Sequence, residues 1–104
     1  MNELRRIIRR TRREITQLPY IAKVYINNQV LIPASLIKAL GIEHINYANI
    51  VLEYNGIEIV LKHVKLLRTK HTASRQFTIP KDVREKYGIK PLDMVKIKDI
   101  KPSD

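Results

Sequence analysis

The sequence contains no cysteine and no tryptophan, and only three of its 104 residues are glycine. The lack of cysteine excludes disulfides and thiolate metal sites. The glycines stand alone at positions 41, 56 and 88, so the chain has no glycine-rich phosphate-binding loop. No apolar run approaches the roughly 20 residues of a membrane-spanning helix, and the N-terminal region has no signal-peptide core. We therefore expect a soluble cytoplasmic protein with no membrane partner.

Acidic residues are also few. Ten Asp and Glu face 20 Lys and Arg, which gives a formal net charge of +10, while 44% hydrophobic residues suffice for one packed domain. Residues 1–22 carry a net charge of +4, residues 23–66 of +1 and residues 67–104 of +5. This excess of positive charge at both ends of the chain predicts a polyanionic partner, nucleic acid before any other.

The residues that could catalyse a reaction or hold a metal are scattered. His44, His63 and His71 show no metal-ligand spacing. Asp82 and Glu85 fall in the first turns of an expected helix, where the helix dipole favours acids without any catalytic role. We predict no metal, no cofactor and no catalytic residue, and we do not expect an enzyme.

Residues 1–19 predict a basic amphipathic helix that ends at Pro19. One side is apolar, and the opposite side carries all the arginines of the segment: Arg5, Arg6, Arg9, Arg10, Arg12 and Arg13. Six arginines on one face with no acid among them favour phosphate contact over simple solvation. A membrane surface is less favoured, because the segment lacks Trp and Phe.

From residue 20 onward the sequence repeats itself with a constant offset of 47. Val30-Leu31-Ile32-Pro33 corresponds to Phe77-Thr78-Ile79-Pro80, and Gly41-Ile42 corresponds to Gly88-Ile89. Each proline favours a strand before it and a helix start at it, and each glycine favours a left-handed cap at the helix end. We predict a barrel domain over residues 20–104, with copy one at 20–66 and copy two at 67–104, packed together as a pseudo-dimer.

Turn residues predict the hairpins. Asn55-Gly56 is expected to join strands Tyr47–Tyr54 and Ile57–Lys65, and Asn27-Asn28 to form the first turn of copy one. Ser74-Arg75 is the corresponding turn of copy two.

Copy two lacks a fourth strand, because the chain has only four polar residues after the strand expected at 93–100. One sheet edge is therefore expected to lack its partner. Tyr20–Ala22, the arginine helix or a second molecule in a homodimer could cover this edge, and the sequence does not choose among them.

Residues 75–89, followed by Asp93-Met94-Val95-Lys96-Ile97, resemble the AbrB/SpoVT/MazE family of swapped-hairpin β-barrels, and residues 29–42 match more loosely. The resemblance covers roughly residues 20–100. It implies a mainly β fold with short helices, in which two units exchange hairpins to close one barrel. Here the two copies in one chain would form that barrel as an intrachain pseudo-dimer, behind a basic N-terminal helix.

The resemblance also implies DNA binding by basic residues near the first strand turn and the helix start. Arg75 stands at the turn and Arg84 on the helix; Arg68 and Lys70 belong to the preceding strand, and Lys81 begins the helix.

Copy one departs from this pattern. It has Asn28, Ala34 and Ile37 at the positions of Arg75, Lys81 and Arg84. Apolar side chains cannot neutralise phosphates, so this surface is expected to pack against something else, and a symmetric grip on palindromic DNA is not expected.

The leading hypothesis is a non-catalytic, prokaryotic, nucleoid-associated DNA-binding protein, either a transcription regulator or a chromatin-type protein. Lys70, Arg75, Lys81 and Arg84 would contact duplex DNA, and the arginine arm would add a sequence-independent grip. The alternative is a ribosome-associated structural protein that binds rRNA, because an asymmetric pseudo-dimer with an arginine arm suits an asymmetric RNA surface better than a palindrome.

Overall fold

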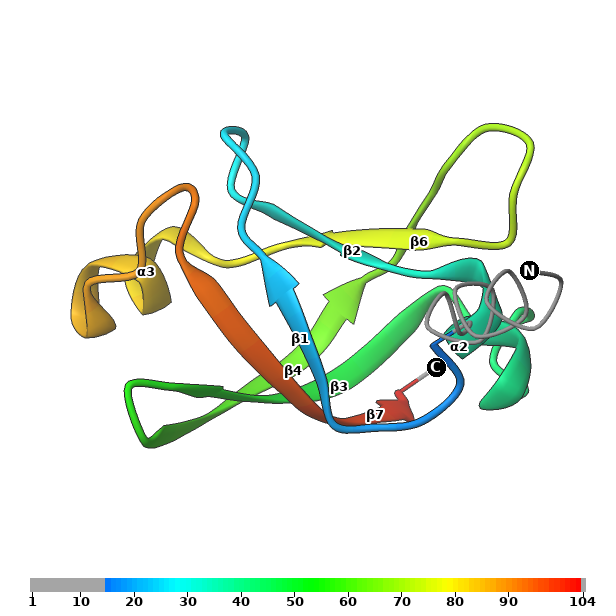
Figure 1. Cartoon of the computed structure of the whole chain (residues 1–104), viewed down its shortest axis with the longest axis horizontal. Helices are drawn as coiled ribbons and strands as arrows, with labels where there is room; N and C mark the ends of the chain where they lie inside the picture. Colours follow the sequence, from blue (N-terminus) through cyan, green and yellow to red (C-terminus); the bar gives the residue numbers. More distant parts are fainter. Residues whose placement is uncertain (1–14, 104) are drawn as a thin grey trace, which may run out of the picture.

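The structure, a computed structural model, describes residues 15–103 of the chain (Figure 1). These residues form seven strands and two short helices: β1 (Tyr20–Lys23), β2 (Gln29–Ile32), α2 (Ala34–Ala39), β3 (Tyr47–Tyr54), β4 (Ile57–Lys65), β5 (Leu67–Arg68), β6 (Arg75–Thr78), α3 (Lys81–Tyr87) and β7 (Met94–Pro102). One sheet has the order β1-β7-β3-β4 and the other the order β2-β6-β5. The expectation of a mainly β fold with short helices is confirmed.

The core lies between the two sheets. Along β3 the buried residues Ala48, Ile50 and Leu52 alternate with partly exposed ones, as a strand with one buried face requires. Val30 of β2 and Phe77 of β6 cover them from the second sheet and are fully buried. One apolar interior therefore serves both copies of the repeat.

The internal repeat is visible in the strand pairing. The offset of 47 residues relates β2 to β6, α2 to α3 and β3 to β7. β2 and β6 are antiparallel, with Val30 directly opposite its own counterpart Phe77. A pseudo-two-fold axis passes through this pair, so the pair Gln29–Thr78 has its counterpart in Leu31–Gln76. β3 and β7 are antiparallel as well, with a bulge at the centre of their ladder.

The edge that copy two leaves open is covered by β1. β1 pairs with β7 on the side opposite β3, from Tyr20 opposite Ile97 to Lys23 opposite Met94. β4 holds the matching position beside β3. Of the three options for this edge, the segment that begins at Tyr20 pairs with Met94–Ile97 of β7, and no described strand pairs with residues 98–102 on that side.

The sheets are linked at two corners, but the described strands do not form a closed barrel. At one corner the Val24–Val30 bridge connects the chain after β1 with β2. At the other, β4 leads with a single intervening residue into β5 of the second sheet.

Local signals for turns and caps are confirmed. The Asn55-Gly56 hairpin has the expected strand bounds, and both turn residues have positive φ, at 50° and 76°. Gly88 takes the left-handed conformation with φ 72°, and the amide of Ile89 donates to the carbonyl of Arg84 at 3.0 Å.

Two local expectations are wrong. β6 begins at Arg75, and residues 69–74 form a loop, so Ser74-Arg75 is not the turn. Hydroxyl groups of Thr69, Thr72 and Ser74 bond to one another and close this loop.

The second error concerns the N-terminal helix. Residues 15–19 are not helical, and the carbonyl of Ile15 accepts a hydrogen bond from Ser35 Oγ at 2.6 Å. The predicted helix therefore does not reach Leu18. The six arginines of residues 5–13 lie outside the described residues.

Candidate nucleic-acid interface

Three of the six lysines on the four-stranded sheet, Lys96, Lys98 and Lys101, are paired with carboxylates. Lys98 Nζ lies 3.0 Å from Glu58 Oε2, and Lys96 Nζ lies 3.5 Å from Glu53 Oε2. Hydrogen bonding to Glu58 raises the pKa of Lys98. These lysines are neutralised within the sheet and make a poor phosphate-binding surface.

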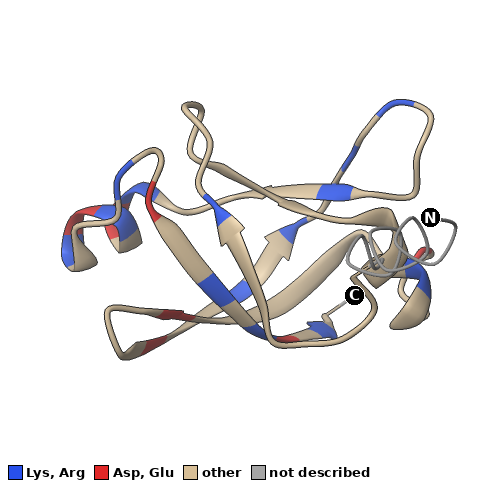
Figure 2. Cartoon of the chain, viewed as in Figure 1, with Lys and Arg blue, Asp and Glu red and all other residues tan. Residues whose placement is uncertain are grey.

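The basic residues outside the four-stranded sheet lie toward two ends of the described structure (Figure 2). One group lies on α3 and just beyond it. The second lies on α2 and on β5 with the loop that follows it, at the opposite end in the view of Figure 1. β6 connects the two ends, because it begins at Arg75 and leads through Pro80 into α3. The residues predicted as one interface are therefore divided between two ends.

At the α3 end, Lys81 is exposed and Arg84 is half-buried. Arg84 Nε donates to the carbonyl of Ile79 at 2.9 Å, which holds the guanidinium group against the start of its own helix. Lys81 Nζ is 3.9 Å from Glu85, a contact between two exposed side chains that contributes little. Lys81 is thus the more accessible of the two predicted contacts.

At the opposite end, Arg68 and Lys70 are exposed as expected, whereas Arg75 is not. Arg75 is 3% exposed, and its guanidinium group donates to the backbone carbonyls of Ala73, Ser74 and Glu43. Burial lowers the pKa of Arg75, and the charge of Arg68 lowers it further. The expectation that Arg75 contacts nucleic acid at an exposed turn is corrected, because this side chain holds the 69–74 loop to the segment after α2.

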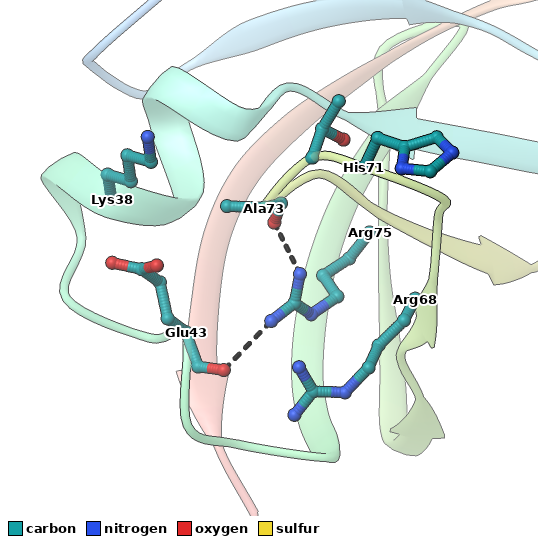
Figure 3. Close-up of a pocket in the computed structure, with 7 residues that line it drawn as sticks. Lys38, Glu43, Arg68, His71, Ala73 and Arg75 are labelled. Atoms are coloured by element: carbon teal, nitrogen blue, oxygen red, sulfur yellow. Dashed lines mark hydrogen bonds between the residues drawn. The ribbon is translucent and has the colours of Figure 1, made fainter.

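An open pocket of about 510 Å³ lies beside Arg75 (Figure 3). Its lining comes from α2, the segment after α2, β5, the 69–74 loop and β6: Lys38, Glu43, Arg68, His71, Thr72, Ala73 and Arg75. The sequence reasoning missed Lys38 and His71 as members of a site. These two residues are brought together by the antiparallel pairing of β2 with β6, which places the helix of copy one beside the loop of copy two.

The cations of this pocket are not repeated at the matching positions of the other copy. The offset of 47 places Glu85 at the position of Lys38, Ile21 at that of Arg68 and Asn28 at that of Arg75. The copy-one position Ile37, which replaces Arg84, is fully buried, as expected for an apolar residue there. The two ends of the molecule are therefore related by the repeat in their backbone structure but differ in the chemistry of their side chains.

The histidines have separate environments. His63 stacks on Tyr47 with ring centroids 4.2 Å apart, and its Nδ1 lies 2.9 Å from Ser103 Oγ. His71 lines the pocket, and His44 is exposed. Within residues 15–103 no three His, Asp or Glu side chains gather as metal ligands.

Comparison with known proteins yields no match to a protein-family model, a curated protein or a solved structure. No helix among the described residues combines the length and apolarity needed to cross a membrane.

Proposed function

We propose that this chain is a non-catalytic nucleic-acid-binding protein whose first target is duplex DNA. The observation that carries the proposal is the group of exposed cations at the end of the molecule that carries β5. Arg68 and Lys70 have no carboxylate within ion-pair distance among residues 15–103, whereas Lys96, Lys98 and Lys101 of the four-stranded sheet lie against carboxylates. Unpaired exposed cations on a body with this net charge are the side chains that release counterions from a polyphosphate.

The contacts proposed for the body are Arg68, Lys70 and Lys81, with Arg84 adding charge from a half-buried position. The arginines of residues 5–13 would add a sequence-independent grip. Ile15, where the described chain begins, is bonded to α2, which also carries Lys38 of the pocket. Residue 15 therefore lies at the same end of the described structure as Arg68.

An AbrB-like arrangement of exchanged hairpins is part of the proposal. The pseudo-two-fold pairing of β2 with β6 and of β3 with β7 supports it. So does the pairing of β1 from copy one with β7 from copy two. The family resemblance is the reason to place duplex DNA first and to propose a regulatory or chromatin-type role at the nucleoid.

RNA is the second candidate, and the inequality of the two ends favours it. A palindromic DNA site presents the same phosphates to both halves of a symmetric protein. In this chain only one end has the cluster of Lys38, Arg68 and Arg75, and copy one buries Ile37 where copy two has Arg84. An asymmetric rRNA surface would fit such a body, which would place the protein on the ribosome.

The test is the salt dependence of binding to a DNA duplex and to a structured RNA of similar length, followed by fluorescence anisotropy. Replacing Lys70 and Lys81 by Gln should weaken binding and lower the slope of log K against log salt by roughly two on duplex DNA. The matched control is Lys23→Gln with Lys62→Gln, which removes the same charge from exposed positions on the four-stranded sheet.

Equal slopes for both double variants would contradict the proposed contacts, and absence of binding to either polymer would contradict the function. Crosslinking in the native cell, followed by identification of the bound polymer as DNA or rRNA, separates the two targets.

A further inference from the structure

The pocket beside Arg75 contains an excess of positive charge that the protein does not neutralise. Lys38, Arg68 and Arg75 contribute three cations, and Glu43 is the one carboxylate in the lining. No ion pair joins Glu43 to any of the three among the described residues; it is the Glu43 backbone carbonyl, not its carboxylate, that accepts from Arg75 Nη2, at 2.8 Å. In Figure 3 the Glu43 carboxylate points away from the two guanidinium groups.

Arg75 is a buried cation that forms no ion pair with a carboxylate among the described residues, and burial and the charge of Arg68 lower its pKa by more than the charge of Glu43 raises it. Its Nη1 donates to the carbonyls of Ala73 and Ser74, and its Nε is buried with no hydrogen-bond acceptor. Carbonyl groups satisfy some of its donors but do not cancel its charge, and burying an unpaired charge is costly. The surroundings of Arg75 are therefore suited to a negatively charged ligand.

A second arginine lies directly opposite Arg75 on the neighbouring strand. Arg68 and Arg75 are cross-strand partners in the short β5–β6 ladder, a position where like charges repel. Figure 3 shows the two guanidinium groups side by side, both extending toward the segment that carries Glu43. An anion bound at this pair would remove the repulsion, and planar guanidinium groups match the oxygen geometry of a phosphate.

We propose that this pocket is a phosphate-binding site for a nucleotide-sized ligand, with Arg68 and Lys38 as the contacting cations and Arg75 as the buried charge behind them. The pocket of about 510 Å³ is larger than a phosphate group needs and falls within the range of small-molecule sites, so it has room for the attached nucleoside. The three cations have no counterparts at the matching positions of the other copy, so this site is not repeated by the internal duplication within residues 15–103.

Titration calorimetry with adenosine 5′-monophosphate tests the free nucleotide as ligand, with unphosphorylated adenosine as the control compound. The nucleotide should bind and adenosine should not. Arg68→Gln and Lys38→Gln should each raise the Kd by about tenfold or more, as expected for loss of a charge-assisted hydrogen bond. Lys62→Gln, an equal loss of charge at an exposed position on β4, should leave the Kd unchanged. All three positions are exposed, so circular dichroism should show the same fold.

A second arm measures the same variants against the DNA duplex and the structured RNA. If the nucleotide does not bind but Arg68→Gln alone weakens polymer binding about tenfold relative to Lys62→Gln, the site takes a phosphate of the nucleic-acid backbone. If neither ligand distinguishes Arg68→Gln from Lys62→Gln, the pocket proposal is overturned, even where the wild type binds nucleic acid. Nucleotide binding that depends on Arg68, without any polymer binding, would support the pocket and contradict the proposed function.

Discussion

Arg75 acts as an internal brace in this structure. Its guanidinium group joins the 69–74 loop to the backbone of Glu43, two segments that no strand pairing connects. The three carbonyl groups that accept from Arg75 would each lose a donor if this side chain were removed, although that of Ser74 also accepts from Thr69 Oγ1. A buried carbonyl without a donor is destabilising. The residue therefore matters for stability before any ligand is considered.

Arg75→Ala should lower the free energy of unfolding by about 2 to 4 kcal/mol. This is less than the sum for its three charge-assisted hydrogen bonds, because the cost of burying the charge is removed together with the side chain. Urea unfolding followed by circular dichroism measures the change. Arg68→Ala, at the exposed partner position on β5, should change the free energy by less than about 0.5 kcal/mol. An unaffected stability of Arg75→Ala, together with lost nucleic-acid affinity, would restore the original interpretation of Arg75 as a surface contact.

At the scale of elements, a side-chain hydrogen bond ties the end of β3 to the loop before β7. Tyr54 Oη donates to Asp93 Oδ2 at 2.7 Å, and the amide of Lys90 donates to the same oxygen at 2.9 Å. The hydrogen bond from Tyr54 lowers the pKa of Asp93, and the bond to Asp93 raises the pKa of Tyr54. Both shifts favour the state in which the carboxylate is ionised and the phenol is protonated.

Tyr54→Phe should therefore be less stable than the wild type, with a pH-dependent difference. A carboxylate with a lowered pKa stabilises the fold above its usual pKa of about 4, and this contribution is lost as the pH falls through the lowered value. A phenol with a raised pKa stabilises below its usual pKa of about 10, and this contribution is lost as the pH rises through the raised value.

The difference in urea midpoint should thus be largest between about pH 5 and pH 9 and should narrow on either side. Tyr25→Phe, at an exposed position on the first hairpin, is the control and should show no such pH profile. A constant difference across the range would mean that Tyr54 acts only through packing.

Elements with strong local signals were predictable from the sequence. Asn55-Gly56 predicted the hairpin bounds because both residues accept positive φ, and the offset of 47 identified the corresponding strands of the two copies, although not which strands pair. The copy-two turn was wrong because the loop depends on hydroxyl contacts among Thr69, Thr72 and Ser74, which no periodicity reveals.

The pocket was not predictable, although two of its cations had been singled out for other reasons. Lys38 and His71 are 33 positions apart and meet only through the antiparallel pairing of β2 with β6. Arg75 has the residue type of a surface contact, and its burial follows from the carbonyl of Glu43, which is distant in the sequence. Residue type and spacing indicated the charge of the site but not its location.

At the scale of the whole molecule, the two copies are interlocked. β7 of copy two lies between β1 and β3 of copy one, and Val30 and Phe77 meet at the centre of the second sheet. Neither copy contains a complete sheet, so neither can bury its apolar residues alone.

Residues 20–66 and 67–104, produced as separate chains, should each lack the circular dichroism spectrum of the folded protein as monomers. Mixing them in equal amounts should restore it, because every ladder between the copies can then form. Size-exclusion chromatography with light scattering distinguishes a 1:1 complex from self-association. A stable folded monomer of either segment would contradict the interlocked arrangement.

The axis through Val30 and Phe77 has a consequence for how such a protein can vary. In an assembly of two identical chains, any substitution is imposed twice, at both ends at once. Here each position occurs once per molecule, so one half can carry Arg68 in the pocket lining while the other keeps the apolar Ile21 at the matching place. Because the two copies belong to one chain, one copy one always pairs with one copy two, whatever the protein concentration.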